Sequence, residues 1–416
     1  MHTDTISAPT ASVGTAQLVC TAEAGGDVLG FVVLDTLVGG KAHGGVRFMP
    51  AVDEDEVRRM ARAMTLKFGF TGLPQGGAKA GILGDPEAPA PERWRRLTAF
   101  GRAIAPLLQT RSFVPGVDMG TGYDDVRHLL AAVGVRPTRR ELRPNDSGYY
   151  TAVSVFAGAE AALGHLGGAL RGATVAIEGF GKVGAALAAL LDAAGARVVA
   201  VSTSRGALYD PRGLDVGRLL ALGAEAGSRV AERYAGAERL ASAELLELPV
   251  DVLCPCAQHD TLHAGNAARV RARIVSPGAN IPYAEGAERR LAERGVLALP
   301  YFVSNCGGVL GGTMAFAAVP RLQVHASVHG FVAAAVPPLL SEAARRGMLP
   351  SAVAEETALR RLARLRVEAQ RGGARGRLFA LGLEAYRRGW VPERLVATLS
   401  LPYFRRRLAL ADVGAE

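Results

Sequence analysis

Residues Ala173–Gly184 of this 416-residue chain, ATVAIEGFGKVG, carry the pattern that decides the fold. The apolar run Ala173–Ile177 is typical of a short buried strand. A glycine turn follows it, then an alanine-rich helix expected at 185–194 and a second apolar run at Arg197–Val201. Strand, glycine turn, helix and strand in this order predict a dinucleotide-binding unit of the Rossmann type.

The glycine turn is expected to bind the cofactor pyrophosphate, because backbone amides at the start of the helix point toward it. The residues of this turn are Gly179, Phe180, Gly181, Lys182, Val183 and Gly184. About 20 residues beyond such glycines, a carboxylate normally accepts the ribose hydroxyls of NAD. This chain instead has Thr203, Ser204 and Arg205 there, so nothing repels a 2′-phosphate and the sequence favours NADP over NAD.

A second glycine-rich stretch, Leu66–Ile82, contains two of the only four lysines in a chain with 48 basic residues. Nearly all the other basic residues are arginines. Lys67 and Lys79 are therefore candidates for a chemical role that needs a compact ammonium able to lose its proton. Together they indicate a pocket for an anionic substrate. The alternative, two lysines on an ordinary surface loop, stays open at this point.

The rest of the chain predicts an α/β protein with two main domains. We expect a strand at Asp27–Asp35, helices at 53–70 and 91–108, a loop carrying Lys79, and an extended segment at 112–122 that carries Asp118. The predicted division is a substrate-binding and catalytic domain at 1–147, a Rossmann domain at 148–322 and a helical C-terminal region at 323–416.

Composition excludes several classes of protein. The 49% hydrophobic and 21% charged fractions fit a globular chain with a sizeable core. There is no run of 18 apolar residues and no signal-peptide pattern, so we expect a cytoplasmic protein without a membrane segment. The net charge of +9 comes from dispersed arginines, which favours a solvated surface over a nucleic-acid groove. The four cysteines form neither a disulfide framework nor a metal-binding pattern.

With these pieces placed, the sequence resembles the glutamate/leucine/phenylalanine/valine dehydrogenase family. The resemblance runs from about Asp27 to Gly312 and rests on several motifs in the family's order. These are GGVRF at Gly44, TLKFGFTGLPQGGAKAGI at Thr65, VDMGTG at Val117, the turn at Gly179, GAN at Gly278 and SNCGG at Ser304. The family resemblance implies the reversible, NAD- or NADP-dependent oxidative deamination of an L-amino acid to a 2-oxo acid and ammonium.

The resemblance also implies roles for individual residues. Lys67 is expected to bind the substrate α-carboxylate, Lys79 to act as the lysine of lowered pKa at the α-carbon, and Asp118 to shuttle protons to and from the amino group. For Asp118 the alternative is an Asx turn before the glycines. Thr151, Asn280 and Asn305 match polar positions near the cofactor and substrate, and each has a helix cap or turn as its alternative.

The substrate-binding positions depart from the family pattern for glutamate. Glutamate-specific members have a lysine before the glycine pair Gly44-Gly45, where this chain has His43, and a serine where it has Gly312. Lys41 lies two residues upstream, a register that argues against its binding a γ-carboxylate. We therefore expect a substrate with a neutral side chain, aliphatic or aromatic, rather than glutamate, and a polar or modified side chain stays open.

Two other functions are considered. A catalytically inactive relative that acts as a binding or regulatory subunit would account for His43, Gly312 and the long helical region. A Rossmann oxidoreductase acting on an imine or a carbonyl without ammonia is the other. The partners expected for the preferred function are an amino acid, a 2-oxo acid, ammonium and further copies of the chain in a homo-oligomer.

Overall fold

A computed structural model describes residues 18–24, 27–138, 140–370 and 374–409 of the chain. The chain forms two compact units, and each combines segments that are distant in sequence. Unit 1 comprises Met1–Pro144, Phe316–Ala318 and Ala358–Leu399, and unit 2 comprises Asn145–Ala315, Val319–Thr357 and Ser400–Glu416. The C-terminal residues therefore divide between the two units, which differs from the separate region expected at 323–416.

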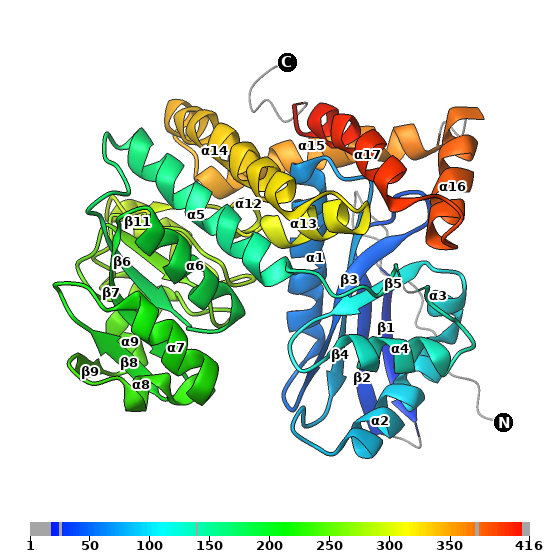
Figure 1. Ribbon diagram of the computed structural model, residues 1–416, viewed down its shortest axis with the longest axis horizontal. Helices are drawn as coiled ribbons and strands as arrows, with labels where there is room; N and C mark the ends of the chain where they lie inside the picture. Colours follow the sequence, from blue (N-terminus) through cyan, green and yellow to red (C-terminus); the bar gives the residue numbers. More distant parts are fainter. Residues whose placement is uncertain (1–17, 25–26, 139, 371–373, 410–416) are drawn as a thin grey trace. The chain divides into compact units, whose positions relative to one another are not determined.

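Unit 1 is built on a five-stranded mixed sheet with the order β1-β2-β4-β3-β5 (Figure 1). Strand β4 is antiparallel to β2 and parallel to β3, and β3 is also parallel to β5. The strands are β1 (Leu18–Ala24), β2 (Asp27–Leu34), β3 (Ala42–Met49), β4 (Gly76–Leu83) and β5 (Phe113–Val117).

Helices cover both faces of this sheet. They are α1 (Glu54–Thr71), α2 (Ala90–Ala103), α3 (Ala105–Gln109) and α4 (Tyr123–Ala131). Helix α1 lies so close to one face that a Cβ on Gly77 of β4 would overlap Thr65 of the helix. On the other face, Phe100 of α2 and Leu129 of α4 belong to one core with alternate residues of the strands, such as Val46.

Two expected helices of unit 1 can be compared with the structure. The helix predicted at 53–70 is confirmed as α1, which begins after Asp53, whose carboxylate accepts from the Glu56 N–H at 2.8 Å. The single helix predicted at 91–108 is wrong, because the chain breaks at Ile104 into α2 and α3. Pro106, two residues later, has no N–H for a continuous helix and instead stands in the first turn of α3.

Unit 2 contains the predicted doubly wound fold. Its seven-stranded sheet has the order β12-β11-β10-β6-β7-β8-β9, parallel from β12 to β7 and antiparallel at β8 and β9. The strands are β6 (Thr174–Glu178), β7 (Arg197–Thr203), β8 (Gly206–Tyr209), β9 (Glu238–Leu240), β10 (Val252–Pro255), β11 (Ile274–Val275) and β12 (Leu297–Ala298). The chain winds from β6 to β7 on one side and to β10 on the other, so ligands are expected where β6 and β10 end.

The helices of unit 2 include the predicted helix after the glycine turn, confirmed as α6. They are α5 (Ser147–His165), α6 (Lys182–Ala193), α7 (Val216–Ala226), the short 3₁₀ turn η1 (Gly227–Arg229), α8 (Val230–Arg233), α9 (Ser242–Leu245), α10 (Ala264–Ala267), α11 (Ala287–Glu293), α12 (Tyr301–Ser304), α13 (Gly307–Phe316) and α14 (Arg321–Arg346). By length and composition α14 alone among the described helices is long and apolar enough to cross a membrane. It packs along α5, however, with one side of it buried, as the core helix of a globular unit does.

The last three helices are α15 (Pro350–Gln370), α16 (Ala374–Arg387) and α17 (Glu393–Ala409). The second part of α15 packs against α1 in unit 1, where a Cβ on Gly69 would overlap the backbone of Ala358. In the same place the Arg361 guanidinium donates to the Phe70 carbonyl and lies 5.4 Å from the centre of its ring. These contacts make residues from the end of the chain part of the N-terminal unit.

Candidate active site

Lys79, which follows Gly76-Gly77-Ala78 in the sequence, lies inside the sheet of unit 1. It is a residue of β4, paired with Val33 of β2, and its side chain is buried. The expected loop position for Lys79 is therefore wrong. Gly76 and Gly77 belong to the strand rather than to a turn, and Gly77 is needed because α1 lies directly against it.

Asp118 is the ion-pair partner of Lys79. Its Oδ2 contacts the Lys79 ammonium, while its Oδ1 accepts the Met119 N–H at 2.7 Å. Asp118 immediately follows β5, and its own N–H donates to Thr121 Oγ1 at 3.0 Å. A Cβ on Gly45 would approach Asp118 too closely, so the second glycine of the pair makes room for this carboxylate. Asp118 therefore stands in a turn and pairs with Lys79, but its carboxylate accepts from the next residue rather than from the residue two positions on, as it would in an Asx turn.

A second buried pair, Arg47 with Glu56, lies beside the first. The Arg47 guanidinium donates to Glu56, and its other terminal nitrogen is 3.8 Å from Asp118 Oδ1. Sequence reasoning assigned no role to either residue. The sequence features that could have indicated this pair are an arginine in the apolar strand that follows the glycine pair and an acidic residue in the first turn of the next helix.

The surroundings of Lys79 favour its neutral form. Burial is the largest cause that holds the pKa of Lys79 well below its ordinary value, followed by the positive charges of Arg47 and Lys67; Glu56 opposes them. Lys67, near the end of α1, is itself only 5% exposed. Both lysines are buried, and the charge of Lys67 lowers the pKa of Lys79. The alternative that they are two lysines on an ordinary surface loop is therefore excluded.

His43, Gly44 and Gly45 lie on β3 beside this site. Gly44 has no room for a side chain, because a Cβ would overlap the Ala78 carbonyl of β4. The His43 ring is 6.2 Å from the ring of Phe68, in an edge-on arrangement. Burial and the nearby charges of Lys41 and Arg387 lower the pKa of His43 to about 4, so its imidazole is neutral near pH 7.

In unit 2 the glycine turn has the geometry that a dinucleotide site requires. Gly179 has φ +92°, and a Cβ on Gly184 would overlap its carbonyl oxygen. The turn is joined to the next strand, because Gly179 N–H donates to Ser202 Oγ at 3.0 Å and Phe180 N–H to the Ser202 carbonyl at 2.7 Å. Gly181 is the exposed N-cap of α6, and no side chain caps that helix.

The residues expected at the ribose lie at the end of β7. Thr203 is the last residue of the strand, and Ser204 and Arg205 form the exposed two-residue turn to β8. Thr203 Oγ1 accepts the Arg205 N–H at 3.1 Å, which fixes the turn. Arg205 has no ion-pair partner within the described ranges of the chain.

Four other predicted residues also belong to unit 2. Thr151 lies on α5, where its hydroxyl donates to the Ser147 carbonyl at 2.9 Å, and Gly308 packs against it. Asn305 follows α12; its Nδ2 donates to the Ala279 carbonyl at 2.7 Å, while its buried Oδ1 has no hydrogen-bond partner in the described chain. Asn280 is half-buried after β11, and Gly312 lies on α13 with the Asn145 side chain 3.7 Å from where its Cβ would stand.

Comparisons with known proteins agree with this geometry. Residues 145–368 match the family described as glutamate/leucine/phenylalanine/valine dehydrogenase, and residues 25–133 match its N-terminal part, described as a dimerisation domain. The glutamate dehydrogenase of Aeropyrum pernix is 35% identical over 287 residues, 65% of this chain and 67% of that protein. The glutamate dehydrogenase of Thermotoga maritima is 37% identical over 297 residues, 67% of this chain and 70% of that protein.

Solved structures give the same result for the fold. The hetero-hexameric glutamate dehydrogenase of Thermus thermophilus, in a leucine-bound form, has a TM-score of 0.70 and 27% identity over 84% of this chain and 88% of that one. The L-tryptophan dehydrogenase of Nostoc punctiforme has a TM-score of 0.59 and 24% identity over 83% of this chain and 96% of that one, a likeness of fold alone. The chain therefore belongs to the glutamate/leucine/phenylalanine/valine dehydrogenase family of amino-acid dehydrogenases.

Proposed function

We propose that this protein is an L-amino-acid dehydrogenase that uses NADP in preference to NAD and acts on a side chain other than that of glutamate. The observation that carries the proposal is the buried contact between the Lys79 ammonium and the Asp118 carboxylate, with Lys67 close enough to lower the pKa of Lys79. Such a site places a lysine that can lose its proton beside a carboxylate that can relay it.

Three charged residues of unit 1 have tasks in the proposed oxidative deamination. The Lys67 ammonium binds the α-carboxylate and so holds the substrate over the site. Lys79, whose neutral form is favoured, takes a proton from the water that adds to the α-carbon once loss of hydride has made that carbon part of an iminium group. Asp118, in contact with Lys79, exchanges that proton with it and carries protons to the departing amino group. A bound nicotinamide cofactor would supply the redox chemistry, by accepting hydride from the α-carbon.

The residues of unit 2 fit such a cofactor. The uncapped amides at the start of α6 and the close packing of Gly179 and Gly184 leave space and donors for a pyrophosphate. The buried Asn305 Oδ1 lacks a donor among the described residues, which suits the carboxamide N–H of a nicotinamide.

The preference for NADP rests on the turn between β7 and β8. Thr203, Ser204 and Arg205 offer two hydroxyls and a guanidinium without an ion-pair partner in the described residues, and no carboxylate stands among them. A phosphate would gain a charge-assisted bond from Arg205, whereas the ribose hydroxyls of NAD would gain nothing comparable.

The proposed preference for a substrate side chain other than that of glutamate rests on His43 and Gly312. The relatives compared above include glutamate dehydrogenases, whereas His43 is neutral near pH 7 and pairs poorly with a γ-carboxylate. Gly312 offers no hydroxyl for the same group.

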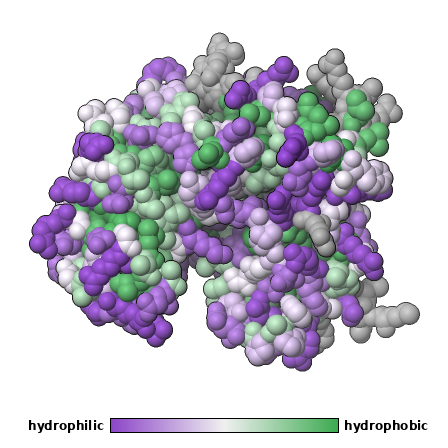
Figure 2. Space-filling view, viewed as in Figure 1, coloured by the Kyte–Doolittle hydropathy of each residue, from purple (hydrophilic) through white to green (hydrophobic). Residues whose placement is uncertain are grey.

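Further copies of the chain are the proposed macromolecular partners. Figure 2 shows apolar residues over α16 and α17, as it also does over parts of unit 2. Several large apolar side chains there are more than half exposed, which is typical of an association surface. They are Leu378, Leu381, Trp390, Leu395 and Leu399.

The first test is a substrate panel. Reduction of 2-oxo acids should require both ammonium and NADPH, and 2-oxoglutarate should be a poor substrate because neither His43 nor Gly312 binds its γ-carboxylate. The measurement is NADPH or NADH absorbance with and without ammonium. Turnover without ammonium would favour a carbonyl or imine oxidoreductase, no turnover would favour an inactive binding subunit, and 2-oxoglutarate as the best substrate would reject the side-chain proposal.

The second test concerns the two catalytic residues. Lys79→Ala and Asp118→Asn should each lower kcat by about 100-fold or more, because each removes an acid–base group. Binding of NADPH, followed by fluorescence titration, should be unchanged because the glycine turn belongs to unit 2. A variant that keeps more than about a tenth of the wild-type kcat excludes that residue from catalysis.

The third test uses the neighbours of Lys79, which change its pKa in opposite directions. Lys79 is neutral above its pKa, so the acidic limb of the kcat/KM profile for oxidative deamination should report that pKa. Arg47→Met removes a charge that lowers the pKa, so the limb should move to higher pH; Glu56→Gln removes a charge that raises it, so the limb should move to lower pH. Thermal unfolding shows that each variant is folded, and shifts in the same direction would contradict the role of Lys79.

The fourth test concerns the cofactor. Arg205→Ala should weaken NADPH binding by about 1 to 3 kcal/mol and NADH binding much less, since only NADPH carries the phosphate. The exposed Arg229 on η1 provides the control, and Arg229→Ala should leave both affinities unchanged. Equal losses for both cofactors in Arg205→Ala, or tighter NADH binding by the wild type, would reject the NADP preference.

A further inference from the structure

Glu178, the last residue of β6, stands at the end of the unit 2 sheet where the glycine turn begins. Its two carboxylate oxygens accept from the loop 256–261, which follows β10: the Ala257 N–H donates at 3.2 Å and the Thr261 hydroxyl at 3.3 Å. The Cys256 N–H also donates to the Glu178 carbonyl, at 2.7 Å. Glu178 therefore joins the loop 256–261 to β6 through both its backbone and its side chain.

The loop 256–261 lies directly against the glycine turn. A Cβ on Gly179 would be 2.8 Å from the Cβ of Ala257 and 2.9 Å from its backbone nitrogen, so a side chain at Gly179 would displace the loop. Burial raises the pKa of the Glu178 carboxyl, and the hydrogen bonds that it accepts from the loop oppose that rise. The partial burial of this carboxylate is thus compensated by the loop and by no other element.

The strand order indicates which half of a dinucleotide would meet this loop. Strands β7 and β10 lie on opposite sides of β6. The pyrophosphate is expected at the glycine turn after β6, and the adenosine ribose beside Thr203 at the end of β7. The nicotinamide half would then extend to the other side, toward β10 and the loop 256–261.

The loop 256–261 in turn holds a second segment, 278–282. At one end of this segment the Ala279 N–H donates to the carbonyl of Pro255, the last residue of β10, at 2.9 Å. At the other end the Asp260 N–H donates to the Ile281 carbonyl at 3.0 Å. The position of the segment 278–282 therefore depends on β10 and on the loop that Glu178 anchors.

Two residues at this junction have left-handed backbone conformations. Asp260 has φ +52° and Ile281 has φ +45°. Such a conformation is strained for a β-branched residue such as isoleucine, and it persists only where the surrounding structure fixes it. The hydrogen bond between Asp260 and Ile281 provides part of that restraint, so the strain at Ile281 requires that the loop 256–261 stay in place.

The segment 278–282 also orients Asn305. The Ala279 carbonyl accepts Asn305 Nδ2 at 2.7 Å, and the buried Asn305 Oδ1 has no donor among the described residues. This oxygen is the proposed acceptor for the carboxamide N–H of the nicotinamide. A displaced loop would move Ala279 and so turn this acceptor away from the cofactor.

We infer that Glu178 is a positioning residue for the nicotinamide half of the cofactor, and that it acts through the loop 256–261 and the segment 278–282 on Asn305. The inference rests on the proposed function, because it requires a bound dinucleotide. Glu178 is not a catalytic residue in this arrangement, since its carboxylate contacts the loop rather than a reacting atom.

The test compares the whole cofactor with the half that lacks nicotinamide. Glu178→Ala leaves two loop donors without an acceptor, so NADPH should bind roughly 2- to 10-fold more weakly, as for the loss of one neutral hydrogen bond. Binding of 2′,5′-ADP, which contains only the adenosine half, should be unchanged. The kcat for the best 2-oxo acid should fall by roughly 10- to 100-fold, because a misplaced nicotinamide transfers hydride poorly. If the wild type binds NADH more tightly, NADH and ADP are the matching pair.

A conservative variant and a matched control separate positioning from a general loss of structure. Glu178→Gln keeps an oxygen that can accept from Ala257 and gains an amide that can donate to the Thr261 hydroxyl, so it should retain most of the wild-type kcat. Asp251 accepts the Thr174 N–H and hydroxyl, both at 2.9 Å, and so joins the same two strands at their opposite ends. Asp251→Ala should lower the thermal unfolding temperature but leave kcat and both affinities unchanged.

A second pair of variants serves if Glu178→Ala does not fold. Thr261→Val removes one of the two side-chain contacts of Glu178 with the loop and should lower kcat by roughly 2- to 10-fold. Thr261→Ser, which keeps the hydroxyl, should restore it.

The outcomes distinguish the inference from the proposed function. Equal losses of NADPH and 2′,5′-ADP binding, unchanged kcat in both Glu178→Ala and Thr261→Val, or a loss in Glu178→Gln as large as in Glu178→Ala overturns the inference and leaves the dehydrogenase proposal intact. If no 2-oxo acid reacts, the proposed function is overturned, and the comparison of NADPH with 2′,5′-ADP still decides the inference. If neither cofactor binds, both are overturned.

Discussion

Unit 1 depends on one constraint, the burial of an ionisable lysine side chain within a sheet. An ionised group removed from water is costly unless an opposite charge accompanies it, and Asp118 provides that charge at Lys79. Arg47 and Glu56 repeat the arrangement next to it, so two cations alternate with two carboxylates under α1. The glycines follow from the same constraint, since Gly45 leaves room for Asp118 and Gly77 lets α1 lie on the strand.

The two candidate sites offer different kinds of groups to a ligand. In unit 2 the glycine turn offers backbone amides and a close approach, so its side chains matter less than its dihedral angles. In unit 1 the proposed recognition groups are side chains whose charge state depends on their neighbours. A nearby substitution that changes charge can therefore alter these groups without touching them, because burial first, and then the charges of Lys41 and Arg387, lower the pKa of His43.

Patterns that are local in sequence were predictable, and contacts that need the folded sheet were not. The order of strand, glycine turn and helix at Gly179 predicted unit 2, because all its elements are adjacent in the chain. Lys79 was expected in a loop because consecutive glycines usually mark turns, whereas Gly77 is required by the approach of α1. Arg47 and Glu56 are nine residues apart and meet only when α1 packs on β3, so no periodicity in the sequence reveals the pair.

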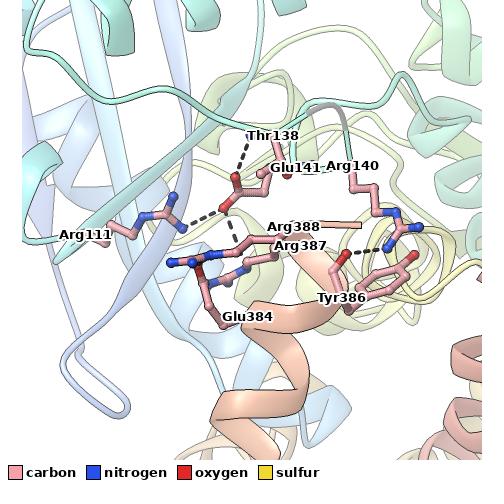
Figure 3. Close-up of polar contacts among 8 residues, drawn as sticks. All are labelled: Arg111, Thr138, Arg140, Glu141, Glu384, Tyr386, Arg387 and Arg388. Carbon is pink, nitrogen blue, oxygen red and sulfur yellow. Dashed lines mark hydrogen bonds and ion pairs between the residues drawn. The ribbon is translucent and has the colours of Figure 1, made fainter. Parts of the chain in front are cut away.

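The contacts of α16 also bear on how the protein is made. Arg140 donates to the Tyr386 carbonyl across 246 positions of sequence, and its guanidinium lies 4.4 Å from the centre of the Tyr386 ring (Figure 3). Unit 1 thus begins with the first strand to be synthesised and is completed only by residues 358–399. During translation the surface of the N-terminal sheet unit that α15 and α16 will cover therefore stays open to water while residues 145–357, most of which belong to unit 2, emerge. Closing so long a loop slows folding more than it lowers stability, so the unit whose synthesis begins first is completed only near the end of the chain.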